Sequence, residues 1–215
     1  MTATTARTST RTTPMLFSRQ RQLLQLLDAL GGTSGMLDFQ KLLFLYCQEA
    51  STGEAPYDFV PYKFGAFSFT SYADRRKLIE RGLLEDEDGW QITAEGRKII
   101  GRTMDMQLAA FAKRHRGLHG DALVADTYRR FPFFATRSEI AERVLKGDDA
   151  ALARIKAVRA KATGPALSTI GYEGHTLESY LTILLKSGVT LLCDVRRNPI
   201  SRKYGFSKNT LARGC

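Results

Sequence analysis

The C-terminal segment contains two short apolar runs separated by a helix-like stretch, and this pattern constrains the fold more than any other feature. Residues 167–174 and 191–203 each begin apolar and end in a polar loop. Between them, residues 176–187 carry leucines and a tyrosine at helical spacing. A strand, a helix and a second strand form a βαβ unit with parallel strands and a right-handed crossover. The sequence therefore predicts the start of an α/β unit within residues 162–215.

In such a unit, the loops after both strands meet at one edge of the sheet, where open α/β sheets bind ligands. Glu173 and Asp194 are the acidic residues brought to this edge, and we predict them as catalytic acid/base candidates. The alternative is that Asp194 only orients Arg196 through an ion pair. The predicted ligand-binding residues at the same edge are Tyr172, Gly174, His175, Arg196, Arg197, Ser201 and Arg202.

An anion is the ligand that these residue types favour. Guanidinium groups hold phosphate or carboxylate in a bidentate manner, and the N-terminus of a helix starting near Thr176 adds N–H donors. The chain has no Walker lysine motif, no Gly-x-Gly-x-x-Gly dinucleotide pattern and no nucleophile elbow. Phosphate binding is therefore predicted without a reaction, and the question of enzyme activity stays open.

Three motifs in this segment also carry a family resemblance. They are Ile170-Gly-Tyr-Glu-Gly174, Asp194-Val-Arg-Arg-Asn-Pro199 and Ser201-Arg-Lys-Tyr-Gly-Phe-Ser-Lys208. In this order they resemble the opening of the domain-of-unknown-function 488 family. The resemblance implies a small α/β domain with a polar pocket between the first two motifs, and it implies no particular reaction. Because members of that family continue further, we expect an incomplete domain in which residues 201–215 are poorly packed. The alternative is that the unit completes itself against the upstream domain or another subunit.

Residues 15–105 predict a mostly helical domain that ends in a hairpin. Helical periodicity covers residues 18–30, 38–46 and 70–82, and residues 83–93 form a hairpin pattern around an acidic turn. This order resembles a winged helix-turn-helix, and residues 62–68 resemble antitoxin domains of the Panacea type. In a DNA-binding winged helix the third helix enters the major groove. Its predicted nucleic-acid-binding residues are Tyr72, Arg75, Arg76, Lys77 and Arg81.

The same helix also fits a solvated surface without a ligand. The turn Glu85–Asp88 would repel phosphates, and acidic residues outnumber basic residues by two over residues 15–105. Protein contact or dimerisation through the winged helix therefore stays an alternative to DNA contact.

The net charge of +10 is concentrated in two regions. Basic residues exceed acidic ones by six over residues 106–161, which predict basic helices, and by six over residues 196–215, which contain no acidic residue. Such concentrations indicate an anionic partner.

Other features narrow the class of protein. No apolar run approaches the roughly 18 residues of a membrane span, so no membrane partner is predicted. Residues 1–14 lack the apolar core of a secretory signal and predict a disordered leader. Three widely spaced cysteines give neither a disulfide framework nor a zinc pattern, and no metal or other cofactor is predicted. We expect a cytoplasmic protein of bacterial type, compatible with an oligomer.

These observations favour a protein that binds nucleic acid with residues 15–161 and a phosphorylated group with residues 162–215. One alternative is an enzyme acting on a small phosphorylated metabolite or nucleotide. Another is a noncatalytic regulator in which the α/β unit senses a ligand and the winged helix binds DNA.

Overall fold

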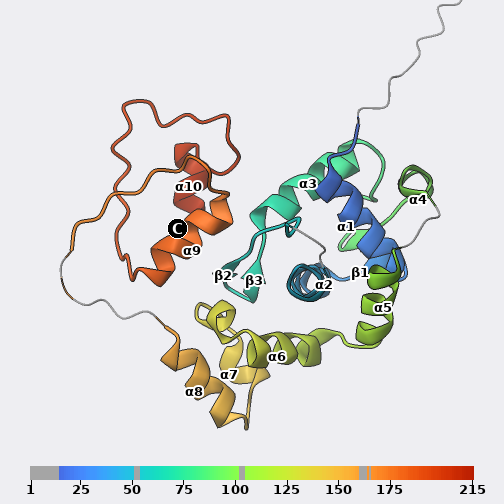
Figure 1. The fold of residues 1–215 in the computed structure, drawn as a ribbon, viewed down its shortest axis with the longest axis horizontal. Coiled ribbons are helices and arrows are strands. Elements are labelled where there is room, and N and C mark those ends of the chain that lie inside the picture. Colours follow the sequence, from blue (N-terminus) through green and yellow to red (C-terminus); the bar gives the residue numbers. More distant parts are fainter. Residues whose placement is uncertain (1–14, 51–53, 102–104, 160–163, 165) are drawn as a thin grey trace, which may run out of the picture.

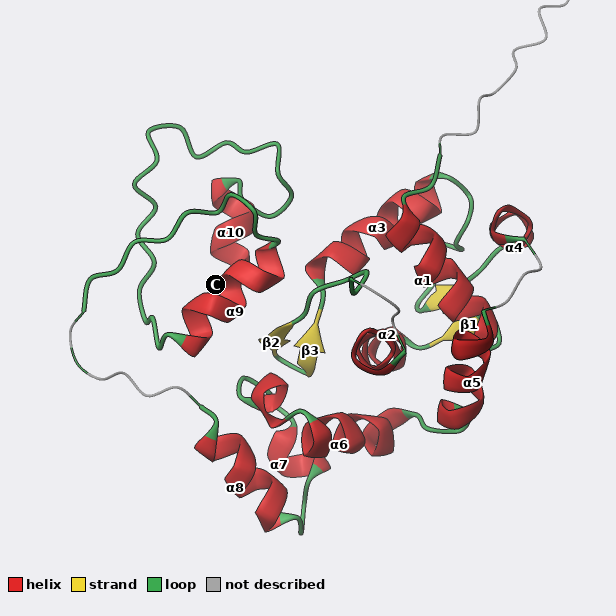
Figure 2. Ribbon diagram, in the orientation of Figure 1, coloured by secondary structure: helices red, strands yellow, loops and turns green. Residues whose placement is uncertain are grey.

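The computed structural model describes residues 15–50, 54–101, 105–159, 164 and 166–215, and these form a mostly helical α+β structure (Figures 1 and 2). This confirms the predicted predominance of helices with a few short strands. None of the described helices is both long and apolar enough to cross a bilayer.

The N-terminal part is built around α2, which is buried along most of its length (Figure 1). The elements of this part are α1 (Ser18–Ala29), β1 (Thr33–Ser34), α2 (Met36–Glu49), β2 (Val60–Tyr62), β3 (Gly65–Phe67), α3 (Phe69–Glu80), β4 (Trp90–Gln91) and α4 (Ala94–Ile100). Leucines on α1 and α2 and the Trp90 ring form one hydrophobic core. The Phe39 and Trp90 rings pack with centroids 4.5 Å apart, which joins α2 to β4.

Two small antiparallel sheets accompany these helices. β1 pairs with β4, and Leu84 forms an isolated bridge with Ile92 beside them. β2 and β3 form a hairpin that follows α2 and precedes α3 in the sequence. The Tyr128 ring of a later helix lies where a Gly65 side chain would be, and Gly65 has a φ of +88°, so glycine is required at this turn.

The middle part is helical and packs against α2 and the hairpin. Its elements are α5 (Met106–His115), α6 (Gly120–Arg130), the 3-10 helix η1 (Pro132–Ala135), α7 (Ala141–Val144) and α8 (Asp149–Ala157). A second core lies between α6, α7 and α8. Phe134 of η1 packs against the first core, since its ring contacts the Phe44 ring of α2 at a centroid distance of 4.7 Å.

The C-terminal unit, residues 166–215, contains two helices joined by long irregular segments (Figures 1 and 2). They are α9 (Leu177–Lys186) and α10 (Lys208–Gly214). Thr176 begins α9 by accepting a hydrogen bond from the Ser179 N–H at 3.1 Å. The apolar face of α9 is buried as its spacing predicted, and it meets Phe206 and Leu211 in a third core.

The two predicted parallel strands are not present in this unit. Residues 166–171 and 189–195 have no strand pairing, and both sheets of the described residues are antiparallel. Leu167, Leu191 and Val195 are 97%, 84% and 88% exposed. A parallel sheet needs cover on both faces. With only α9 and α10 beside these segments, pairing them would bury too little apolar surface to offset the ordering of the backbone.

The expectation that residues 201–215 are poorly packed was also wrong in its central part. Phe206 is 1% exposed and Leu211 is 7% exposed, and both contact α9 through the third core. The Pro199 carbonyl accepts a hydrogen bond from the Lys208 N–H at 2.9 Å, which closes the loop before α10. Apolar side chains within the segment supply this packing.

Candidate functional site

The predicted convergence of the Tyr172 and Arg196 regions occurs without the parallel strands. The Arg196 guanidinium lies 5.2 Å from the centre of the Tyr172 ring. Tyr172 stacks on Phe206, with ring centroids 4.9 Å apart and planes 22° from parallel. The Lys203 ammonium donates a hydrogen bond to the Tyr172 carbonyl at 3.1 Å. These four residues form the stacked cluster of the C-terminal unit.

Asp194 holds Arg196 in this cluster. Arg196 Nε lies 2.7 Å from Asp194 Oδ1 and Nη2 lies 2.6 Å from Oδ2, while Nη1 donates to the Phe206 carbonyl at 2.8 Å. The hydrogen bonds from Arg196 lower the pKa of Asp194 to about 2. These contacts match the prediction that Asp194 orients Arg196. They also leave Arg196 with its charge paired, so it is poorly suited to clamp a second anion.

The second carboxylate of the predicted pair has a different environment. Glu173 is exposed, and its carboxylate makes no hydrogen bond or ion pair with the described residues. Gly174 follows with a φ of +76°, which turns the chain toward α9. The His175 N–H donates to the Tyr172 carbonyl at 3.3 Å, and the His175 side chain is half-buried. The catalytic roles of Glu173 and Asp194 stay predictions.

The remaining predicted ligand-binding residues lie on the loop before α10. Ser201 is structural: its N–H donates to Ser207 Oγ and its own Oγ accepts from the Lys203 N–H, both at 3.1 Å. Arg197 and Arg202 are exposed and form no ion pair with a described residue. Lys208 is also exposed and also forms no ion pair with a described residue. The segment 197–208, which ends at the first residue of α10, therefore presents three exposed cations without an ion pair among the described residues, and we name it the basic loop.

The five residues predicted on α3 separate into packed and exposed groups. Tyr72 packs against Phe67 and Trp90. Arg75 donates to the Glu87 carbonyl at 2.7 Å and to the Gly89 carbonyl, so it fixes the acidic turn against α3. Two cations, Arg76 and Lys77, are exposed on the next positions. Arg81, the last of the five, is half-buried at the C-terminal end of the helix.

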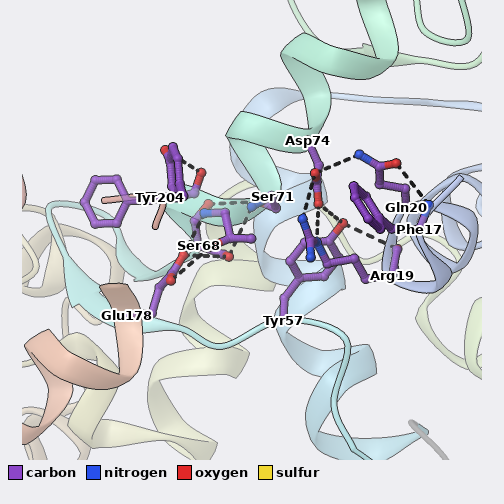
Figure 3. A network of polar contacts seen from close by, with 11 residues as sticks. Phe17, Arg19, Gln20, Tyr57, Ser68, Ser71, Asp74, Glu178 and Tyr204 are labelled. Carbon is purple, nitrogen blue, oxygen red and sulfur yellow. Dashed lines mark hydrogen bonds and ion pairs between the residues drawn. The ribbon is translucent and has the colours of Figure 1, made fainter. Parts of the chain in front are cut away.

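Figure 3 shows two buried carboxylates that were not predicted as site residues, Asp74 of α3 and Glu178 of α9. Asp74 is 1% exposed and accepts hydrogen bonds from Arg19 Nε at 2.6 Å, Gln20 Nε2 at 2.8 Å and the Tyr57 hydroxyl at 3.1 Å. In the sequence, Asp74 stands beside Arg75 and Arg76, and this pattern does not indicate that its carboxylate is buried. The partners are 17 to 55 positions away, and only tertiary contacts reveal them.

Glu178 joins the C-terminal unit to α3. Its carboxylate is fully buried and accepts from the Thr70 N–H at 2.7 Å, from Thr70 Oγ1 at 3.1 Å and from Ser68 Oγ at 3.1 Å. Burial raises the pKa of Glu178, and the Thr70 and Ser68 donors oppose this shift. The carboxylate thus satisfies N-terminal donors of α3 from another helix, which its charge also favours. We call this contact the Glu178 latch.

Further contacts support the latch around its edge. The Tyr204 hydroxyl donates to the Phe69 carbonyl at 3.1 Å. Thr176 Oγ1 donates to Asp58 at 2.7 Å, and Thr182 Oγ1 donates to the Phe59 carbonyl at 3.2 Å. The third core includes Val60 of β2. The C-terminal unit is therefore docked on the N-terminal part by polar and apolar contacts together.

A comparison with protein families found a match in the C-terminal unit. The family model described as "Domain of unknown function DUF488" matches residues 176–215. The C-terminal segment is similar to DUF488. This match confirms the predicted DUF488 resemblance over the second and third motifs, and the first motif, residues 170–174, lies before the matched residues. The match covers α9, the basic loop and α10, and so includes Glu178, Asp194 and Arg196. No curated protein and no solved structure gave a significant match.

Within the part of the chain that the structure describes, no three His, Cys, Asp or Glu side chains gather as they would around an ion. His115 lies 3.1 Å from a Glu49 oxygen, and Arg114 and Arg130 contact the same carboxylate. These contacts with Glu49 join α2, α5 and α6, so they have a structural role.

Proposed function

We propose that the chain binds nucleic acid through the basic loop and the adjoining end of α3. The observation that carries this proposal is the unpaired charge of residues 196–215, which contain six basic and no acidic residues. Among the described residues, Arg196 is the one member of this set that has an ion pair. Exposed cations without a carboxylate partner attract phosphate backbones and release counterions when they bind.

The basic loop and α3 are neighbours, which supports a shared surface. The Tyr204 hydroxyl reaches the Phe69 carbonyl at the start of α3. Burial raises the pKa of Tyr204, and the nearby Arg76 cation opposes this shift. Arg76 therefore lies close to the basic loop, and Lys77 follows it on the exposed side of α3. A phosphate backbone could contact both segments at once.

The order of elements supports a winged-helix function for the N-terminal part. Two helices with a short strand between them, and then the β2–β3 hairpin, precede α3, and β4 and the Leu84–Ile92 bridge follow it. Winged-helix proteins place their third helix against DNA. Because Arg75 is occupied by the acidic turn, we assign DNA contact to Arg76 and Lys77. The acidic turn would repel phosphates, so the duplex would approach from the side of the basic loop.

The basic middle part contributes less to this proposal. Four of its arginines form ion pairs: Arg114 and Arg130 with Glu49, Arg129 with Asp148, and Arg143 with Asp121. Paired cations release fewer counterions, so the net charge of this region overstates its attraction for phosphate.

Fluorescence anisotropy of labelled duplex and single-stranded DNA at several salt concentrations tests the proposal. The triple variant Arg197→Gln/Arg202→Gln/Lys208→Gln should lower the duplex salt slope by roughly 3, since each phosphate contact contributes about 0.9. The control is Lys113→Gln/Arg116→Gln/Lys146→Gln, which removes the same charge from exposed positions of the middle part. An equal loss of salt slope in both variants would mean that net charge, and not the position of the cations on the basic loop, determines binding. Absence of binding by the wild-type protein at low salt would refute the proposal.

A further inference from the structure

Two hollows lie between the C-terminal unit and the rest of the molecule, and the first is in the region where α9 faces the β2–β3 hairpin in Figure 1. The first has a volume of about 310 Å³ and is lined by residues 60–63, by α9 and by the segment after α9. The second has a volume of about 520 Å³ and reaches η1 and the end of α8. Both are lined by Arg137, Leu185, Val189 and Thr190, so they are two parts of one groove.

The groove combines an apolar wall with cations. Leu181, Leu184 and Leu185 line it from α9, and Val189 and Leu192 continue the apolar surface. Three cations, Lys63, Arg137 and Arg159, are among the lining residues of the two hollows, and no Asp or Glu is. Charge and apolar surface therefore occur together, as in sites that hold an amphiphilic ligand by a few polar groups.

Arg137 is the cation best placed to hold a ligand. It lies at the junction of the two hollows, is exposed, and forms no ion pair with a described residue. The other two cations are engaged: Lys63 lies 3.7 Å from Glu139, and Arg159 donates to the Thr136 carbonyl. An arginine with free donors can bind a carboxylate in a bidentate manner.

We propose that this groove binds a small organic anion with an apolar body, of the class of medium-chain alkyl carboxylates. The carboxylate would pair with Arg137, and the alkyl chain would cover Leu184, Leu185 and Val189. The first hollow alone falls at the lower end of the range of about 300–1,000 Å³ that is usual for small-molecule sites. No Asp or Glu side chain is among the described lining residues, which disfavours a cationic ligand.

Binding in this groove has a consequence for the docking of the C-terminal unit. One wall is α9 and its following segment, and the other consists of residues 60–63 and Arg137. A ligand that contacts both walls binds the docked form and stabilises it by mass action. The site is independent of nucleic-acid binding, and the proposed function can fail without affecting it.

Decanoate, below its micellar concentration, is the probe. Titration calorimetry should show saturable binding to the wild-type chain, and hydrogen exchange of α9 should slow when decanoate is bound. Arg137→Glu should weaken binding at least tenfold. Arg116→Glu is the matched control, since Arg116 is exposed, lies outside the groove and has no ion pair with a described residue. It should bind decanoate like the wild type.

Decanol separates charge recognition from simple apolar adsorption. It should bind at least tenfold more weakly than decanoate, because it cannot form the ion pair with Arg137. Circular dichroism of each variant establishes that it is folded. Three results would overturn the proposal: no decanoate binding by folded wild-type protein, unchanged affinity in Arg137→Glu, or equal affinity for decanol.

Discussion

At the scale of single residues, the unusual feature of this molecule is the number of charged side chains inside it. Lys41, Asp74 and Glu178 are each no more than 1% exposed. Buried charges are costly unless partners replace the lost water. Asp74 and Glu178 each accept three or more hydrogen bonds, whereas the Lys41 ammonium donates to the Ala66 carbonyl at 2.8 Å. Of these three buried side chains, Lys41 therefore has the least compensation for the loss of hydration.

Lys41 should make stability depend on pH above neutrality. Burial lowers its pKa from 10.5 to about 7. Between these values the unfolded chain binds the proton and the folded chain does not, so folding is favoured as pH rises. Relative to Lys41→Met, the wild type should gain up to about 1.4 kcal/mol per pH unit over this range. Urea unfolding of both proteins from pH 7 to pH 10 measures the difference, and parallel pH curves would contradict it.

At the scale of elements, contacts between helices far apart in the chain position the candidate sites. The Glu178 latch ties α9 to the start of α3 across 108 positions. Arg75 ties α3 to the acidic turn before β4. As a result, one end of α3 lies beside the basic loop and its middle lies beside an acidic segment.

The latch can be tested by truncating its carboxylate. Glu178→Ala should cost about 1–3 kcal/mol of unfolding free energy, because the Thr70 N–H would lose its partner. The exposed Glu173 provides the control, since Glu173→Ala removes the same group where it has no hydrogen bond with a described residue. Chemical denaturation of the two variants compares them. An equal, small effect would show that the latch adds no net stability.

The stacked cluster gives a second test at this scale. Phe206 is 1% exposed and contacts both the Tyr172 and Tyr180 rings. Phe206→Ala should cost about 3–5 kcal/mol within the C-terminal unit, as large-to-small core changes do. Tyr204→Phe, which changes a half-buried neighbour of the same loop, should cost much less. Near-UV circular dichroism and thermal melts of both variants provide the measurement, and similar melting temperatures would argue against a packed cluster.

At the scale of the whole molecule, the three cores differ in size, and stability should follow them. Among the described residues, the first core contains 24 buried apolar side chains, and the third contains seven. Regions with few buried contacts open at lower free energy than the global transition. Native-state hydrogen exchange should therefore show α9 and α10 opening before α1 and α2. Equal protection of all four helices would instead indicate that docking makes the chain a single cooperative unit.

The sequence by itself determined the periodic elements and the charge. The apolar spacing of residues 176–187 predicted α9, and the motifs of residues 194–199 and 201–208 predicted a DUF488 resemblance that the family model confirms. These features depend on neighbouring residues, so a linear pattern contains them. The charge of the basic loop could also be counted directly.

Tertiary structure alone decided which of these residues are paired and which segments form strands. Glu178 and Asp74 look like ordinary helix-surface acids in the sequence, yet their partners lie 17 to 110 positions away. Residues 167–170 and 191–194 have the composition of strands but no strand pairing. Strand pairing and charge burial both depend on surfaces brought from elsewhere in the chain, because their free energy comes from the removal of water by distant residues.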